Sequence, residues 1–216
     1  MYRVLLLFLS FSVLLTSCNK DEGEDSLVQQ DADVGFFALQ VGNSWVYNYF
    51  RVNSETGELS NLGATETIEV IDEEAIGEEV VFTLKTTTVD TENNCGPCNT
   101  SPEYTLKVKD SLGYLVEVDG PILFSSINDE EYLVLSQEFG DIFRVLKPNE
   151  VLITVPAGQF VTKDNERYAI DPEGNRFDGQ DNLYYAEGIG EIRQTISTVA
   201  TQRIIYEKQL MSYNVQ

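Results

Sequence analysis

Cysteine is the residue type whose spacing in this sequence most directly suggests chemistry. The chain of 216 residues has three cysteines, Cys18, Cys95 and Cys98, and no histidine. A cysteine thiolate can act as a nucleophile, bind a metal or form a disulfide, depending on its surroundings. The absence of histidine excludes serine–histidine–acid triads, cysteine–histidine pairs and His-Glu-x-x-His zinc sites. The role of each cysteine therefore has to be inferred from the residues around it.

Cys18 follows a segment with the features of a secretory signal. Arg3 precedes an apolar run from Val4 to Leu15, which is too short for a membrane-spanning helix. The four residues Leu15-Thr16-Ser17-Cys18 resemble a bacterial lipobox, in which the cysteine is lipidated and the preceding peptide is removed. The resemblance implies a lipoprotein signal peptide over residues 1–17 and an acylated (palmitate-type) membrane anchor at Cys18. Two or three acyl chains would make that anchor stable. The alternative is an ordinary signal peptide beside an unmodified cysteine.

A short charged segment follows the anchor cysteine. Residues 18–35 are polar and acidic, which favours an unfolded tether between the membrane and the folded domain. Within it, Lys20, Asp21 and Glu22 resemble the lysine and two acids that follow the lipidated cysteine in surface-exposed lipoproteins of Bacteroidota. That resemblance implies a protein anchored in the outer membrane and exposed at the cell surface. The alternative is a solvated linker without an export signal.

Cys95 and Cys98 lie in the sequence Asn94-Cys95-Gly96-Pro97-Cys98-Asn99. The Cys-Gly-Pro-Cys tetrad occurs in thioredoxins, where it begins a helix that activates the first thiol. Here Asn99-Thr100-Ser101-Pro102 follows instead of an amphipathic helix, and no strand–helix–strand alternation surrounds the motif. Because exported proteins retain disulfides, we expect a Cys95–Cys98 disulfide in a loop between two strands. Redox catalysis and free or metal-bound thiols are the alternatives.

The charge of the chain excludes one large class of partner. Lysine and arginine number 14 against 36 aspartates and glutamates, a formal net charge of −22. Removing residues 1–17 takes away Arg3, so the mature net charge is 13 − 36 = −23. Such a surface repels phosphate, so nucleic-acid binding is not expected. Cationic partners and calcium remain compatible with this charge.

The most polar segment, from Asp171 to Asn182, has acids interspersed with glycines, a pattern that can bind calcium. An EF-hand loop needs glycine at its sixth position and glutamate at its twelfth, where this sequence has Arg176 and Asn182. We therefore expect an ordinary long hairpin loop and assign no metal or other cofactor.

Alternation of apolar and polar residues predicts β-strands through most of the chain. Val80, Phe82 and Leu84, for example, share one face of a predicted strand. Turn-forming residues separate such runs, and continuous helical periodicity is missing. The expected fold is all-β: an antiparallel meander of about ten strands that forms a strongly curved sheet, barrel or half-barrel with few helices. It is expected as a single domain over residues 36–216.

Two groups of side chains in this domain suggest ligand chemistry. Trp45, Tyr47 and Tyr49 share one face of a predicted strand and could stack on sugars, although such a row is more often part of the core. Glu187 and Glu191 could form the carboxylate pair of a glycosidase, but charged residues are common at strand ends. We therefore assign no catalytic residue and leave the ligand-binding residues open.

Three short signatures complete the sequence evidence: Val41-Gly42-Asn43-Ser44-Trp45-Val46-Tyr47, Pro156-Ala157-Gly158-Gln159-Phe160 and Tyr185-Ala186-Glu187-Gly188-Ile189-Gly190-Glu191-Ile192. In this order they resemble a group of uncharacterised bacterial lipoproteins, mostly from Bacteroidota, over roughly residues 41–213. The resemblance implies a β-domain similar to curved-sheet envelope proteins that chaperone lipids or lipoproteins.

These observations predict a monomeric, non-catalytic, lipid-anchored surface protein. Its β-domain would bind a small ligand, a glycan or a partner protein. One alternative is a lipid or lipoprotein carrier with an apolar concave face. The other is a hydrolytic enzyme that uses paired carboxylates.

Overall fold

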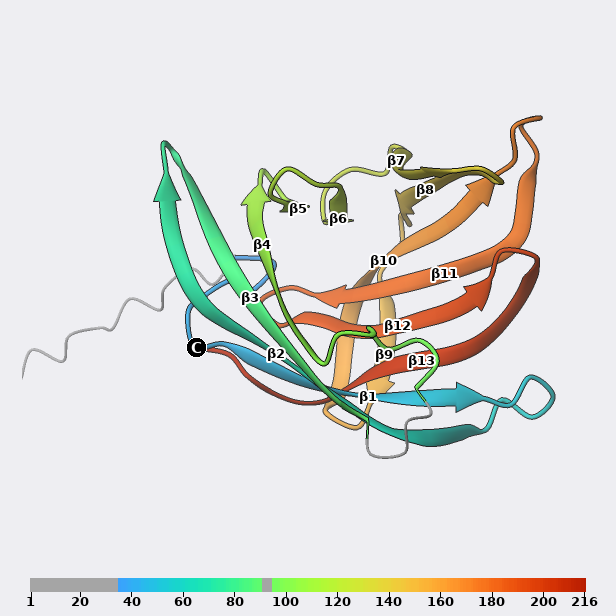
Figure 1. Cartoon of the computed structure of the whole chain (residues 1–216), viewed down its shortest axis with the longest axis horizontal. Helices are drawn as coiled ribbons and strands as arrows, with labels where there is room; N and C mark the ends of the chain where they lie inside the picture. Colours follow the sequence, from blue (N-terminus) through green and yellow to red (C-terminus); the bar gives the residue numbers. More distant parts are fainter. Residues whose placement is uncertain (1–34, 91–94) are drawn as a thin grey trace, which may run out of the picture. The chain divides into compact units, whose positions relative to one another are not determined.

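The computed structural model describes residues 35–90 and 95–216, and its regular elements are all β-strands (Figure 1). They are β1 (Ser44–Val52), β2 (Leu59–Ile76), β3 (Glu79–Asp90), β4 (Glu103–Ser111), β5 (Tyr114–Glu117), β6 (Ile122–Ser125), β7 (Tyr132–Gln137), β8 (Gly140–Leu146), β9 (Val151–Val155), β10 (Gly158–Ile170), β11 (Arg176–Ala186), β12 (Gly190–Thr198) and β13 (Thr201–Asn214). The all-β prediction is confirmed, with thirteen strands in place of about ten. In these two ranges, no helix is long and apolar enough to cross a membrane.

The strands form one antiparallel sheet with the order β6-β5-β4-β3-β2-β1-β13-β12-β11-β10-β8-β7, and β9 pairs with β10 outside this path. The first and last strands are neighbours, since Ser44 of β1 pairs with Asn214 of β13. Consecutive strands pair on either side of this central contact, as expected for a meander joined by short turns, except that β10 pairs with β8 in the main path. The sheet curves into a nearly closed barrel, and its path ends at β6 on one side and β7 on the other (Figure 1).

Alternation along β1 directs three aromatic side chains into the core. Trp45, Tyr47 and Tyr49 are 5%, 1% and 5% exposed, whereas the residues between them are only partly buried. The indole Nε1 of Trp45 donates to the carbonyl oxygen of Ile189 at 2.6 Å, which satisfies its polar group inside the core. These aromatic residues are therefore core residues, and they do not form a sugar-stacking surface.

The turn before β1 also contributes to the core. Phe37 and Ala38 are almost fully buried, and each joins one of two apolar clusters. Phe82 and Leu84 of β3 pack against both clusters, so the turn and the strands form one continuous core. Burial of each large side chain contributes about 1.5–3 kcal/mol to stability.

The polar segment 171–182 differs from the predicted long loop. β11 begins at Arg176, which leaves only residues 171–175 as a turn. Arg176 makes contacts across to β10: its Nη2 lies 2.6 Å from Glu166 Oε1, and its guanidinium lies 3.7 Å from the centre of the Tyr168 ring. These cross-strand contacts stabilise a strand that the polar sequence does not indicate. Within the part of the chain that the structure describes, no group of three or more Asp, Glu or Cys side chains is placed to hold a metal ion.

Side chains, instead of a backbone ladder, join β6 to the strands across the barrel. Asn165 of β10 is fully buried; its amide accepts a hydrogen bond from the Ser125 N–H at 3.2 Å and donates to the Ser125 carbonyl at 2.9 Å. The carboxamide thus takes the place of a peptide group on a neighbouring strand. Arg144 of β8 donates to the Leu123 carbonyl, and Tyr132 of β7 donates to Asn165 Oδ1 at 2.9 Å. We call this junction of β6 with β7, β8 and β10 the seam.

Candidate functional site

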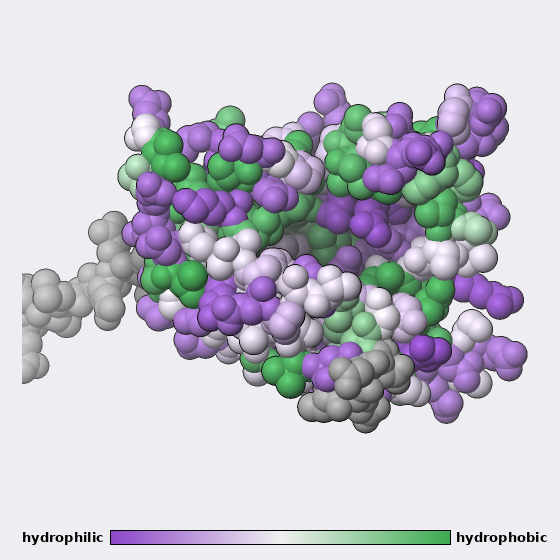
Figure 2. Space-filling model, viewed as in Figure 1, coloured by the Kyte–Doolittle hydropathy of each residue, from purple (hydrophilic) through white to green (hydrophobic). Residues whose placement is uncertain are grey.

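The barrel interior contains a cavity of about 430 Å³, a volume within the usual range of ligand pockets. The space-filling view shows the molecule hollowed near the middle of one face (Figure 2). Strands from both halves of the sheet line the cavity. The lining comprises four charged residues (Glu66, Arg144, Glu191 and Lys208), three tyrosines (Tyr49, Tyr104 and Tyr185), six aliphatic residues (Ile68, Leu84, Leu106, Leu115, Leu123 and Leu183), and Thr86, Pro97, Asn99 and Gln194.

Lys208 of β13 lies between two carboxylates on the cavity wall. Its Nζ is 3.3 Å from Glu66 Oε1 on β2 and 2.8 Å from Glu191 Oε1 on β12. The Tyr49 hydroxyl donates to Glu66 Oε2 at 2.8 Å, and the Lys208 ammonium lies 4.6 Å from the centre of the Tyr47 ring. We call these five residues the lysine cluster. Since the Lys208, Glu66 and Glu191 side chains are only 8%, 5% and 12% exposed, solvent screens their attraction weakly.

The lysine cluster keeps Lys208 charged. Burial acts to lower the pKa of Lys208, but the attraction of Glu191 and Glu66, together with the two tyrosines, outweighs burial and raises that pKa well above the ordinary range of a lysine. Burial also raises the pKa of Tyr47 and of Tyr49, so both phenols stay protonated. A lysine that acts as a general base needs a pKa lowered toward neutrality. The pKa of Lys208 is instead raised, so Lys208 is not suited to act as a general base.

Arg144 is the second cation of the cavity and has a different environment. Its guanidinium donates to the Leu123 carbonyl and interacts with Tyr132, while its Nε is buried without a hydrogen-bond partner. Among the described residues, no carboxylate lies within ion-pair distance of Arg144. Burial lowers the pKa of Arg144 and the nearby Arg167 acts in the same direction, while Tyr132, Tyr185 and the more distant Glu191 partly oppose this shift. Arginine nevertheless remains charged in proteins, so the cavity wall holds a cation without a carboxylate partner.

Residues 95–102, the described part of the connection between β3 and β4, form part of the cavity wall and contain the two cysteines. Cys95 and Cys98 are joined by a disulfide, and both pack, as Tyr206 does, against a small apolar cluster of β1 and β2. Pro97 and Asn99, on either side of Cys98, line the cavity. The disulfide therefore holds together a loop that contributes directly to the cavity wall.

The other residues singled out in the sequence do not form a second site. Glu187 is exposed and lines a different depression, whereas Glu191 belongs to the lysine cluster, so the two do not form a carboxylate pair. The anchor cysteine Cys18 and the export-signal residues Lys20, Asp21 and Glu22 lie outside the described residues. The signal peptide of residues 1–17 and almost all of the tether over residues 18–35 also lie outside them.

Three of the four charged residues that line the cavity were not predicted from the sequence: Glu66, Arg144 and Lys208. The sequence contains a pattern that could have indicated them, because each is a charged residue within a predicted strand and not at a turn. Glu66 stands two residues before Ile68, and alternation places both on the same face of β2, where both line the cavity. Charged residues on the buried face of a strand are uncommon unless they are paired. The sequence does not show which strands face one another across the barrel.

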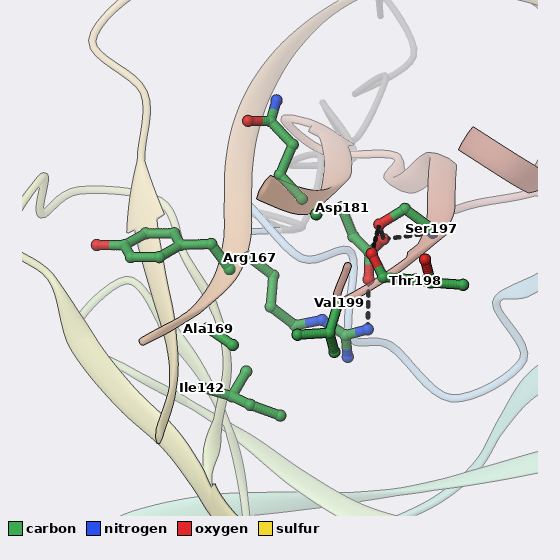
Figure 3. A pocket seen from close by; sticks show the side chains of 10 residues that line it. Ile142, Arg167, Ala169, Asp181, Ser197, Thr198 and Val199 are labelled. Atoms are coloured by element: carbon green, nitrogen blue, oxygen red, sulfur yellow. Dashed lines mark hydrogen bonds and ion pairs between the residues drawn. The ribbon is translucent and has the colours of Figure 1, made fainter. Parts of the chain in front are cut away.

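Two other depressions are poorer candidates. A small pocket of about 80 Å³ lies between β10, β11 and β12 (Figure 3). In it, Asp181 Oδ1 accepts hydrogen bonds from the Ser197 N–H at 2.6 Å and the Ser197 hydroxyl at 2.8 Å, and its Oδ2 pairs with Arg167 (Figure 3). These paired groups join neighbouring strands. A larger depression of about 810 Å³ beside residues 146–150 is lined mostly by exposed side chains.

No family model and no curated protein matches the chain. Two solved structures are similar to it. One is a protein of Bacteroides fragilis that is inferred to be exported and has a YmcC-like fold; it is 13% identical, with a TM-score of 0.52 and coverage of 83% of this chain and 99% of that chain. The other is an inferred lipoprotein of Parabacteroides distasonis, 13% identical, with a TM-score of 0.50 and coverage of 83% and 98%. At this identity the likeness establishes the fold, and it is consistent with the resemblance to Bacteroidota lipoproteins.

Proposed function

We propose that the protein is a non-catalytic, lipid-anchored protein of the cell envelope whose β-domain binds a small ligand in the barrel cavity. The cavity of about 430 Å³ carries this proposal, because it combines desolvated charges with an aliphatic wall. A few placed polar groups within an otherwise apolar lining are typical of small-molecule sites.

The lipobox and the segment after it support the cellular location. Leu15-Thr16-Ser17-Cys18 would provide the lipid anchor, and Lys20-Asp21-Glu22 would direct the protein to the outer surface of the outer membrane. The exported and lipoprotein character inferred for the two structural neighbours is compatible with this location. Cys18→Ala should release the protein from membranes, and unchanged membrane fractionation would refute the anchor. Replacing Lys20, Asp21 and Glu22 with neutral residues should leave the protein membrane-bound but protected from external protease.

The charges of the cavity favour binding over hydrolysis. Glycoside hydrolysis by paired carboxylates needs one acid with a raised pKa beside an ionised partner. In the cavity, Glu66 and Glu191 instead flank the same ammonium, that of Lys208. Both oxygens of Glu66 already have structural partners, since Oε1 lies beside Lys208 Nζ and Oε2 accepts a hydrogen bond from the Tyr49 hydroxyl.

The binding proposal is tested by isolating the protein from its native envelope under mild conditions. The protein is then denatured, and the small molecules released are identified by mass spectrometry. We expect one compound in roughly equimolar amount, above the level released by an unrelated envelope lipoprotein. A preparation that releases no compound above that background would contradict binding in the cavity.

A further inference from the structure

We infer that Arg144 is the anion-recognition group of the cavity, and that the ligand is an amphiphile with a single anionic headgroup, either a carboxylate or a phosphate monoester. This inference rests on the proposed function of the cavity and specifies its ligand class. Its basis is the placement of the charges on the wall, where both carboxylates lie beside Lys208, the neighbours of Arg144 and the distribution of apolar side chains.

The two cations of the cavity are not equivalent. Lys208 lies between Glu66 and Glu191, and the three groups together carry one net negative charge, so another anion would be repelled there. Arg144 has a carbonyl and a phenol as partners and, within residues 35–90 and 95–216, no carboxylate. A buried cation without a counter-ion costs stability, and that cost falls when an anion binds. A guanidinium also matches the planar, two-oxygen geometry of carboxylates and phosphates.

The neighbour of Arg144 on the next strand strengthens this argument. Arg144 of β8 stands directly opposite Arg167 of β10 in the strand register. Like charges in this relation are destabilising. Asp181 forms an ion pair with Arg167, so one positive charge of the two arginines remains without a carboxylate. A ligand anion at Arg144 would balance it.

The apolar part of the lining begins beside Arg144. Leu123, whose carbonyl accepts the hydrogen bond from Arg144, also lines the cavity, as do Leu115 and Leu183. An anionic headgroup at Arg144 would therefore place an attached hydrocarbon chain next to leucine side chains. A small inorganic anion would leave this wall without a partner, so the cavity fits an amphiphile better than a free ion.

The test uses the full acylated protein in envelope membranes and three photoreactive probes with the same diazirine-bearing ten-carbon chain. They are a carboxylic acid, an uncharged alcohol and the phosphate monoester of that alcohol. After irradiation, labelled peptides are mapped by mass spectrometry and normalised to the labelling of bulk membrane protein. In the wild type, we expect peptides with cavity-lining leucines to be labelled about tenfold more by an anionic probe than by the alcohol. Which anionic probe labels more strongly distinguishes a carboxylate ligand from a phosphate ligand.

Three variants give the test its controls. Arg144→Gln should reduce the anionic preference about tenfold, whereas Arg144→Lys should retain most of it because the charge remains. Lys163→Gln is the matched control, because Lys163 also donates to a carbonyl at the seam, that of Ser126 at 2.5 Å, but does not line the cavity. The Lys163→Gln variant should keep the preference of the cavity for an anionic probe over the alcohol. Circular dichroism of each variant checks that the fold is intact.

The outcomes separate this inference from the proposed function. Equal labelling of the cavity by acid and alcohol in the wild type would overturn the role of Arg144 and leave ligand binding standing. A preference that Arg144→Gln does not alter, or that Lys163→Gln alters equally, would also overturn it. No cavity labelling by any probe would contradict both the inference and the proposed function.

Discussion

Replacing Lys208 with methionine should destabilise the protein far more than removing a comparable lysine at the surface. Methionine preserves much of the side-chain length but leaves Glu66 and Glu191 buried without their cation. Breaking a buried ion pair from one side costs about 3–5 kcal/mol of unfolding free energy. We expect a loss in that range for Lys208→Met at neutral pH.

Lys85→Met is the matched control. Lys85 Nζ lies 2.9 Å from Glu103 Oε2, almost the same separation as between Lys208 and Glu191, but the two side chains are 37% and 59% exposed. Exposed pairs of this kind contribute about 0.2–1 kcal/mol. Because the distances match, the difference between the two variants measures the combined effect of burial and of the second carboxylate beside Lys208.

The assay is equilibrium unfolding in urea, followed by the fluorescence of Trp45, which is the single tryptophan of the chain and is buried. The triple variant Lys208→Met, Glu66→Gln and Glu191→Gln should recover part of the stability at pH 7. A Lys208→Met cost no larger than that of Lys85→Met would refute the buried ion-pair arrangement.

Three further predictions concern the seam, the disulfide and the buried phenols. Asn165→Leu leaves both backbone groups of Ser125 without their side-chain partner and should cost about 3 kcal/mol, with faster amide exchange at Ser125; unchanged exchange there would contradict the seam. The double variant Cys95→Ser and Cys98→Ser should lose about 2 kcal/mol by the chain-entropy estimate for a short ring, and reductant should then have no further effect on its unfolding midpoint. Burial raises the pKa of several tyrosines, to about 12 for Tyr132 and Tyr184 and further for three others (Tyr47, Tyr49 and Tyr185). Because these pKa values are raised in the folded state, their contribution to stability is complete below about pH 10 and is lost as the pH rises above that value, up to about pH 12 for Tyr132 and Tyr184 and further for the other three. Phenolate absorbance and unfolding at each pH would measure this together.

The fold class could be predicted from the sequence because the alternation of apolar and polar residues in a strand is a local pattern. Trp45, Tyr47 and Tyr49 show the period of two, and the structure places all three in the core. The start of β11 could not be predicted in the same way. Arg176 is held in that strand by Glu166 and Tyr168 of the neighbouring strand β10, and contacts between strands leave no pattern in a polar stretch.

The cavity was less predictable than the fold, because its charges come together from distant parts of the chain. Glu66 and Lys208 are separated by 142 positions and meet only because β1 lies between β2 and β13 in the sheet. Alternation identifies which face of a strand a side chain occupies. It does not identify the residue opposite, so a lysine flanked by two carboxylates and an arginine with none beside it look alike in sequence.

Occupancy of the cavity is measured most directly by native mass spectrometry of the protein isolated from its own envelope, compared with a Gln194→Phe variant. Gln194 lines the cavity, and a phenylalanine there would fill part of its volume without removing a charge. We predict that the wild type carries one bound anionic amphiphile and that the variant, folded and acylated as before, has lost most of it. Wild-type protein at the mass of the acylated chain alone, or a ligand retained equally in the variant, would contradict the assignment of the cavity as the binding site.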